Sequence, residues 1–357
     1  MLLEGMFAPI TTPFYGDGSL YLRKLEHNVD RYSRTPLAGL VVLGSTGEAV
    51  MLTDAEAREV LSVAATAAAP EKVLLAGVGQ ESVAGTLALA EHAAACNYDA
   101  VLVRTPSFYR PLLHRKGTQT EMLTYFRTVA DRSPLPVVLY SVSVFTQYDL
   151  PVEVIAELAQ HPNIIGLKES SGNEERIAAV VERTRSKRRN VTVTPVFAAV
   201  TGRMLAQNAV GEGAATFVSA DSLGVGGAAV AVAPPKQTLK TRTKEVGFQV
   251  LAGSAQTMLS SLHAGAVGTI LAFTDCAPQA CYEVFAAWKD GDEKLAAEKQ
   301  HRIAAAAQRI AGEMSIPGVK YACERNGYYG GRPRLPLLPL TAAEQAEVDT
   351  LMADMPN

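Results

Sequence analysis

The chain has 357 residues, of which 48% are hydrophobic and 19% charged, with a formal net charge of -3. This composition suits a globular protein with a large core, and the charge gives no indication of a surface for nucleic acid or an anionic membrane. The four cysteines form no Cys-x-x-Cys pair, the start of the chain has no secretory pattern, and the longest apolar run is too short to span a bilayer. We therefore expect a cytoplasmic protein with free thiols.

The sequence repeats one pattern, a short apolar run followed by a helical stretch. Each run is continuous rather than alternating, which is typical of strands buried on both faces of a parallel sheet. Helices are predicted at Asp54–Ala68, which Thr53 would cap, and at Val83–Ala95, Met122–Asp131, Pro151–Gln160 and Glu174–Arg185. The pattern predicts an α/β fold, a (β/α)8 TIM barrel, with a doubly wound open sheet as the alternative. The eight predicted strands are Phe7–Thr12, Gly39–Leu43, Val73–Val78, Ala100–Arg104, Val137–Tyr140, Ile164–Lys168, Phe248–Ala252 and Gly268–Phe273.

Two segments fall outside this pattern. Residues from about 187 to 246 interrupt the sixth βα unit and carry few side chains suited to chemistry, so we expect an insertion with a structural or interfacial role. Its glycine cluster, Gly224–Gly227, is a poor match to a dinucleotide-binding loop. After the last strand, helices are predicted near Pro278–Lys289, Asp292–Gly312 and Thr341–Met355. The expected domains are a barrel over residues 1–275, interrupted by the insertion, and a C-terminal helical region over residues 276–357.

Lys168 is the first candidate for chemistry, because it closes the otherwise apolar run Ile164–Lys168. Active sites of TIM barrels lie at the carboxyl ends of the strands. Burying an ammonium group is costly, and burial favours the neutral amine, which attacks carbonyl groups. The alternative is a lysine that reaches solvent or pairs with Glu169.

Two further strand ends carry polar groups. Tyr140 ends the run Val137–Tyr140, where a phenol can move protons at a reacting carbon; the alternative is an aromatic ring that closes the barrel. Gly44-Ser45-Thr46-Gly47-Glu48 follows the second run, and its hydroxyl and backbone N–H groups can hold a carboxylate; the alternative is a turn that caps the next helix. The six histidines show no metal-ligand spacing and no Gly-x-Ser-x-Gly occurs, so a metal site and a serine hydrolase are poorly supported.

In their order and spacing, these features resemble the dihydrodipicolinate synthase / N-acetylneuraminate lyase family. The motifs are Gly44–Glu48, Tyr140 and Gly166–Asn173, and the opening Met6–Phe14 is similar too. The likeness covers about residues 4–186 and 247–345. It implies a homo-oligomer, a tetramer or a dimer, in which Lys168 forms a Schiff base with a small 2-oxo acid. No metal or organic cofactor is implied.

The resemblance also implies roles for neighbouring residues. Ser45, Thr46 and Gly47 would bind the substrate carboxylate, with Ser45 and Tyr140 taking part in catalysis. Ser170 and the backbone carbonyl of Ile270 would face the substrate, and Ser141 would support the site from behind. The family's second relay tyrosine, donated by a neighbouring subunit, is replaced by Phe108. Either Tyr109 takes its place or the relay is shorter.

The expected substrate depends on the segment after Tyr140. Phe145 stands where the synthase has an arginine that grips its second substrate, and a phenyl ring cannot clamp a carboxylate. Tyr140-Ser141-Val142, Ser170, Ile316–Lys320 and Gly327–Gly331 more closely resemble 4-hydroxy-2-oxoglutarate aldolase. We therefore predict a lyase that cleaves 4-hydroxy-2-oxoglutarate to pyruvate and glyoxylate. The alternatives are 4-hydroxy-tetrahydrodipicolinate synthase, a deoxy-sugar-acid aldolase, and a catalytically silent barrel that binds a 2-oxo acid.

Overall fold

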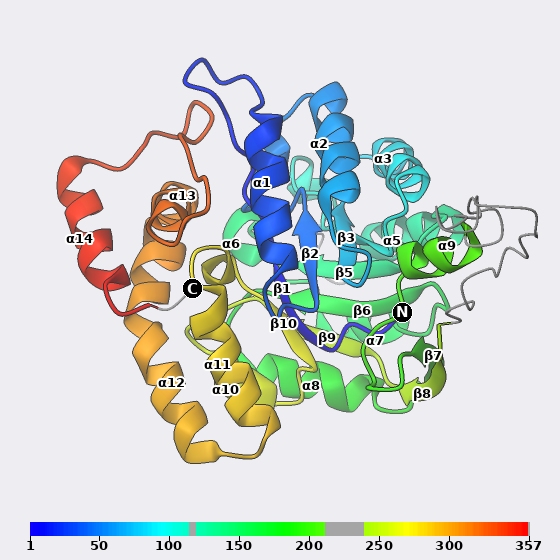
Figure 1. The fold of residues 1–357 in the computed structure, drawn as a ribbon. Helices are drawn as coiled ribbons and strands as arrows, with labels where there is room; N and C mark the ends of the chain where they lie inside the picture. Colours follow the sequence, from blue (N-terminus) through cyan, green and yellow to red (C-terminus); the bar gives the residue numbers. More distant parts are fainter. Residues whose placement is uncertain (114–118, 211–238, 356–357) are drawn as a thin grey trace, which may run out of the picture.

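A computed structural model describes residues 1–113, 119–210 and 239–355. Within them, eight parallel strands close into a barrel in the order β1-β10-β9-β6-β5-β4-β3-β2 (Figure 1). The predicted TIM barrel is thereby confirmed, and the open-sheet alternative is wrong. The strands are β1 (Gly5–Ala8), β2 (Gly39–Val42), β3 (Val73–Gly77), β4 (Ala100–Arg104), β5 (Val137–Ser141), β6 (Ile164–Glu169), β9 (Gln249–Ala252) and β10 (Gly268–Ile270).

Helices surround the barrel and bury one face of each strand. Apolar residues such as Phe7, Leu75 and Leu251 form one cluster of buried side chains, while a larger cluster joins the other strand faces to the helices. α2 begins with the expected cap, because Thr53 and Glu56 form a reciprocal capping box. The barrel helices are α1 (Leu22–Ser33), α2 (Asp54–Ala67), α3 (Val83–Ala95), α5 (Thr120–Arg132), α7 (Val152–Leu158), α8 (Glu174–Thr184), α10 (Met258–His263) and α11 (Pro278–Lys289). The short elements are η1 (Ala49–Met51), α4 (Arg110–Leu113), α6 (Ser143–Thr146) and η3 (Ala272–Asp275).

Two strands differ from their predicted bounds by more than one residue at an end. β1 covers Gly5–Ala8 rather than Phe7–Thr12, because Pro9 has no N–H to donate to a ladder. β10 ends at Ile270 rather than at Phe273, because the chain turns into the 3-10 helix η3. Both changes lengthen the loops at the carboxyl end of the barrel.

The segment between α8 and β9 lies at the amino end of the barrel. β7 (Arg189–Val193) and β8 (Arg242–Val246) form an antiparallel pair, and α9 (Gly202–Val210) lies between them in sequence. The Gly202 N–H donates to Asp99 Oδ1 at 3.0 Å, and Thr201 Oγ1 donates to the Pro70 carbonyl at 2.5 Å. These contacts join the segment to the loops that lead into β3 and β4. The glycine cluster Gly224–Gly227 lies outside the described residues.

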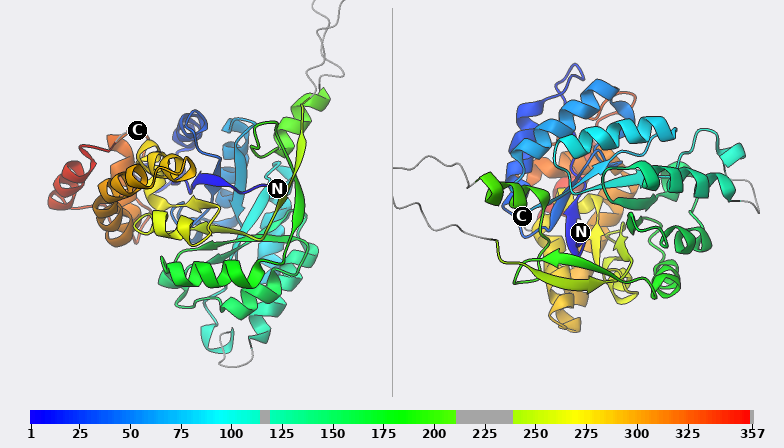
Figure 2. Two further views of the ribbon diagram at one scale, coloured as in Figure 1. Left: turned by 90° about the horizontal axis from the view of Figure 1, so that it is seen from below. Right: turned by 90° about the vertical axis from the view of Figure 1, so that its right-hand side faces the viewer.

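The C-terminal helices lie at the opposite end of the molecule from β7 and β8 (Figures 1 and 2). They are α12 (Glu293–Ala306), the π-helix η4 (Ala307–Glu313), α13 (Ser315–Arg325) and α14 (Ala342–Met352). η4 continues α12 directly, and π-helical turns are frequent at functional sites. Among the described helices, none is long and apolar enough to cross a membrane.

Candidate active site

Lys168 and Tyr140 lie side by side on neighbouring strands. β5 and β6 pair in parallel with Tyr140 opposite Lys168, and the Lys168 Nζ is 4.3 Å from the centroid of the Tyr140 ring. Lys168 is buried, with 4% of its surface exposed, so it does not reach solvent. Glu169 instead pairs with Arg176, whose Nε donates to Oε2 at 2.8 Å. Both structural alternatives for Lys168 are therefore wrong, and no carboxylate of the described residues forms an ion pair with its amine.

Ser45 connects the loop after β2 to Tyr140. The Ser45 Oγ and the Tyr140 hydroxyl are 3.2 Å apart, at hydrogen-bonding distance. The loop is a tight turn, in which the Gly47 N–H donates to the Gly44 carbonyl and the Glu48 N–H to the Ser45 carbonyl, both at 3.1 Å. It does not cap α2, because Thr53 has that role. The turn thus presents its hydroxyl groups beside the amine and the phenol.

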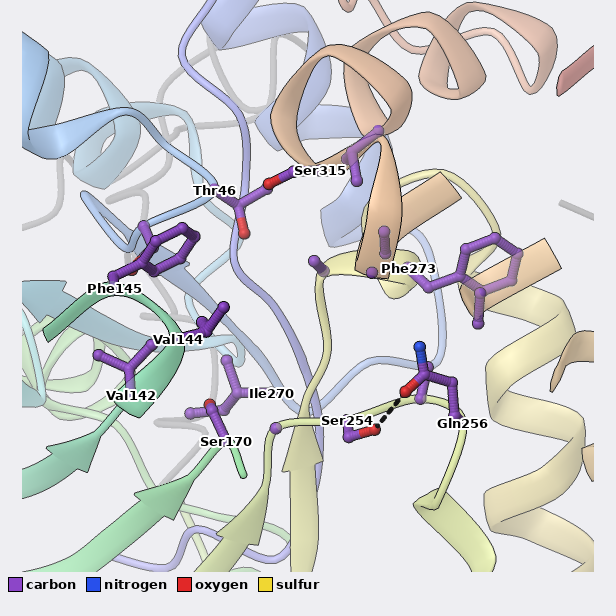
Figure 3. Close-up of a pocket in the computed structure, with 18 of the residues that line it drawn as sticks. Thr46, Val142, Val144, Phe145, Ser170, Ser254, Gln256, Ile270, Phe273 and Ser315 are labelled. Carbon is purple, nitrogen blue, oxygen red and sulfur yellow. Dashed lines mark hydrogen bonds between the residues drawn. The ribbon is translucent and has the colours of Figure 1, made fainter. Parts of the chain in front are cut away.

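These residues line one cavity of about 510 Å³ at the carboxyl end of the barrel. Of the residues predicted for the site, the cavity is lined by Ser45, Thr46, Tyr140, Lys168, Ser170 and Ile270. The C-terminal region closes it with η4 and the start of α13, including Gln308, Ser315, Ile316 and Val319. In the view of Figure 3, Thr46 and Ser315 lie on one side of the cavity, and Ser170 and Ile270 lie on the other. Sequence reasoning missed this contribution of the C-terminal helices.

Four predicted residues lie elsewhere. Gly47 and Ser141 do not line the cavity; the Gly47 carbonyl accepts from Thr12 at 2.6 Å, and Ser141 is buried behind the site. Phe108 lines a second cavity of about 590 Å³, which shares Ser45 and Tyr140 with the first. Tyr109 is 61% exposed and lines neither cavity of the described residues. Within one chain, neither Phe108 nor Tyr109 joins the hydrogen-bonded pair of Ser45 and Tyr140.

The cavity lining is mostly apolar and almost without ionisable groups. Among its described lining residues, Lys168 alone carries a charged side chain. Hydroxyl and amide groups supply the remaining polarity, from Ser170, Ser254 and Gln256; the Ser254 hydroxyl donates to Gln256 Oε1 at 3.2 Å (Figure 3). No group of three His, Cys, Asp or Glu in the described part of the chain is arranged to hold a metal ion. The lining suits one imine-forming centre surrounded by hydrogen-bonding groups.

Asp275 is an acidic residue that sequence reasoning overlooked. It ends η3, directly after β10, and is fully buried, with neither carboxyl oxygen hydrogen-bonded to a described residue. Its burial raises the pKa of the carboxyl group well above the usual range, and the charge of Lys168 opposes that rise. The signal in the sequence was a single carboxylate within the apolar stretch that follows the last strand.

Comparison with known proteins assigns the chain to a family. The model of the dihydrodipicolinate synthetase family matches residues 2–193 and 223–355. A 4-hydroxy-tetrahydrodipicolinate synthase from Xanthomonas axonopodis pv. citri is 32% identical, covering 99% of this chain and 95% of that protein. One from Methanothrix thermoacetophila is 27% identical over 99% of this chain and 97% of its own length.

Solved structures share the fold. Dihydrodipicolinate synthase DapA-2 from Bacillus anthracis superposes with a TM-score of 0.77, at 20% identity and with full coverage of both chains. YagE, a prophage protein from E. coli K12 solved in complex with pyruvate, gives a TM-score of 0.76 at 23% identity, with 99% of both chains covered. The matched family model, the curated relatives and the closed barrel agree, and the chain belongs to the dihydrodipicolinate synthetase family of lyase and synthase enzymes.

Proposed function

We propose that Lys168 is the Schiff-base residue of a pyruvate-dependent class I aldolase. The observation that carries this proposal is the position of its amine. It is buried at the end of β6, unpaired with any carboxylate of the described residues, and lies against Tyr140. A nucleophilic amine with a hydroxyl-bearing residue beside it can form an imine and move protons near it.

The proposed reaction begins when the Lys168 amine attacks the C2 carbonyl of a 4-hydroxy-2-oxo acid and water leaves. The protonated imine then accepts electrons at C2. Ser45 and Thr46 bind the C1 carboxylate through hydroxyl and backbone N–H groups. Tyr140, hydrogen-bonded to Ser45 at 3.2 Å, takes the proton of the C4 hydroxyl as the C3–C4 bond breaks. The aldehyde leaves, the same proton is returned to C3 of the enamine, and water releases pyruvate.

We propose 4-hydroxy-2-oxoglutarate as the first substrate to test, with deoxy-sugar acids beside it. Phe145 lines both cavities and is 56% exposed, and it places an apolar ring at the mouth of the site. Ser170, Ser254 and Gln256 offer hydrogen bonds to an aldehyde that bears hydroxyl groups or one carboxylate. Such groups orient a substrate without a second cation.

A second candidate is 4-hydroxy-tetrahydrodipicolinate synthase. The names of the curated relatives favour it directly. Against it stands the sequence resemblance, because a synthase must hold the carboxylate of its aldehyde substrate, and Phe145 occupies the position expected for the clamping arginine. Among the described residues that line the second cavity, Arg104 is the one cation, and its Nη1 pairs with Glu81 Oε1 at 2.9 Å.

The experiment that separates these functions compares three reactions on one preparation. Pyruvate release from 4-hydroxy-2-oxoglutarate and from a deoxy-sugar acid is followed by coupling to lactate dehydrogenase. Condensation of pyruvate with aspartate semialdehyde is followed as consumption of pyruvate. The proposal expects cleavage with Lys168 intact and none in Lys168→Ala. Efficient condensation without cleavage would assign the synthase, and no reaction with any substrate would favour a silent barrel.

We further propose that the protein forms a homo-oligomer whose subunit interface lies near the site. The exposed fractions of Phe108, Val50 and Val144 are 77%, 74% and 67%, and these residues lie in the loop after β4, in η1 and in α6, which all follow barrel strands. Exposed apolar side chains gathered near a site are typical of protein interfaces. Light scattering should give at least a dimer, and Phe108→Glu should shift it towards a monomer; a monomeric wild-type protein at micromolar concentration would refute this.

A further inference from the structure

A buried ion pair lies behind the turn that carries Ser45 and Thr46. The side chains of Glu48 and Lys320 are both fully buried, and Lys320 Nζ lies 2.5 Å from Glu48 Oε1. The second carboxylate oxygen, Oε2, accepts the backbone N–H of Arg334 at 2.7 Å. Glu48 is the last residue of the turn after β2, whereas Lys320 belongs to α13. The pair thus joins the barrel to the C-terminal region.

Lys320 is held on several sides. Its Nζ donates to the Arg332 carbonyl at 3.0 Å and lies 4.4 Å from the centroid of the Phe14 ring. Desolvation lowers the pKa of Lys320, and the charge of Glu48 opposes that effect. A buried pair of this kind stabilises little compared with apolar packing, but losing one partner leaves the other charge without compensation. Stability alone therefore does not explain why this ion pair is present.

The backbone conformation of Glu48 suggests a role for the ion pair. Its φ of 56° lies in the left-handed region, which is unfavourable for a residue other than glycine or asparagine. Its N–H donates to the Ser45 carbonyl at 3.1 Å, so its backbone closes the turn over Ser45 and Thr46. Lys320 and Arg334 hold the side chain and with it this backbone conformation. Strain that is maintained by buried contacts is concentrated at functional sites.

The same helix also contacts the cavity. Ser315, Ile316 and Val319 of α13 line it, and Lys320 follows Val319 directly. α13 packs closely on η4 at Gly318, where a Cβ atom would lie 2.5 Å from the Ile310 carbonyl oxygen. One rigid unit therefore both closes the cavity and anchors the turn.

We propose that Glu48 and Lys320 are positioning residues, which hold the Ser45–Thr46 turn in the conformation that receives the substrate carboxylate. The C-terminal region is then part of the binding site. This inference rests on the proposed Schiff-base function of Lys168, because pyruvate capture at that residue is its readout. Misplacing such a turn by about 1 Å can cost up to about 100-fold in reaction efficiency.

The test compares three variants: Glu48→Gln, Lys320→Met and the double variant Glu48→Gln/Lys320→Met. The matched control is Lys72→Met, because Lys72 is also buried, but at the amino end of the barrel, where its Nζ donates to the Thr35 and Leu37 carbonyls at 2.7 and 2.8 Å. For each protein, the pyruvate concentration that gives half-maximal borohydride-trapped adduct is measured together with the thermal midpoint.

We expect both single variants to lose thermal stability. The pyruvate concentration for half-maximal trapping should rise at least about tenfold in each. The double variant should regain thermal stability, because neither charge is buried alone, but it should still need the higher pyruvate concentration. Lys72→Met should lose stability with an unchanged pyruvate requirement.

Two results would overturn the inference while leaving the proposed function intact. One is a double variant that traps pyruvate as readily as the wild type. The other is a Lys72→Met variant whose pyruvate requirement rises as much as that of Lys320→Met, since the effect would then follow stability alone. Absence of any adduct in the wild-type protein would instead overturn the proposed function, and this inference with it.

Discussion

Replacing Asp275 by asparagine should change how stability depends on pH. The Asp275 carboxyl group is fully buried, and neither oxygen is hydrogen-bonded to a described residue, so its pKa is raised well above the ordinary value of 3.8. Between that ordinary value and the raised pKa of the folded protein, the unfolded chain loses the proton while the folded protein keeps it. The folded state then binds one more proton than the unfolded state, so rising pH favours unfolding. The free energy of unfolding should fall by about 1.4 kcal/mol per pH unit from this residue alone.

Asparagine cannot ionise, so Asp275→Asn removes this slope. The variant's free energy of unfolding, minus that of the wild type, should therefore increase with pH from pH 5 upwards, by up to about 1.4 kcal/mol per pH unit over the range in which the folded wild type keeps its proton. Guanidinium unfolding at pH 5, 6 and 7 measures this difference. Asp149→Asn is the control, because Asp149 is exposed and its replacement should shift all three values alike. Parallel curves for Asp275→Asn and the wild type would show that Asp275 is ionised in the folded protein.

Three further substitutions test the site. Tyr140→Phe should lower turnover by about 10²- to 10⁴-fold in the lactate dehydrogenase assay, but should still trap pyruvate on borohydride treatment, because only proton transfer is lost. Turnover equal to that of the wild type would show that Tyr140 does not transfer the proton. Ser45→Ala should raise the pyruvate concentration for half-maximal trapping, since a hydroxyl at the carboxylate is lost, and unchanged trapping would assign binding to the backbone alone. Phe145→Arg should raise the rate of pyruvate condensation with aspartate semialdehyde, measured against the wild type; no gain would show that Phe145 does not set the substrate.

The barrel could be predicted because its strands are continuous apolar runs separated by helices, a pattern typical of parallel strands buried on both faces; the closure of the sheet, which the open-sheet alternative lacks, was decided by the structure. α1 was not predicted, since Leu22–Ser33 is rich in charged residues and its N-cap makes no side-chain hydrogen bond. α13 was missed for a different reason. Pro317 and Gly318 disfavour a helix, but proline is tolerated in the first turn and Gly318 is required by its close packing on η4.

The strand-end residues of the site could be placed from the sequence, because the barrel brings all carboxyl ends to one face. Lys168 and Tyr140 come together through the register of β5 and β6, which follows from the parallel pairing. The pairing of Glu48 with Lys320 could not be predicted, since it joins segments far apart in the sequence through packing of the C-terminal helices. Glu48 and Lys320 were each noted as the last residue of a motif, and neither motif indicated its partner.

The most direct test of the proposed function is to trap the imine itself. The folded wild-type protein is incubated with pyruvate, reduced with borohydride, digested and mapped by peptide mass spectrometry. The proposal predicts a reduced pyruvyl adduct on the peptide that carries Lys168, absent in Lys168→Ala. A folded wild-type protein that yields no adduct, or an adduct on Lys320 in place of Lys168, would contradict it.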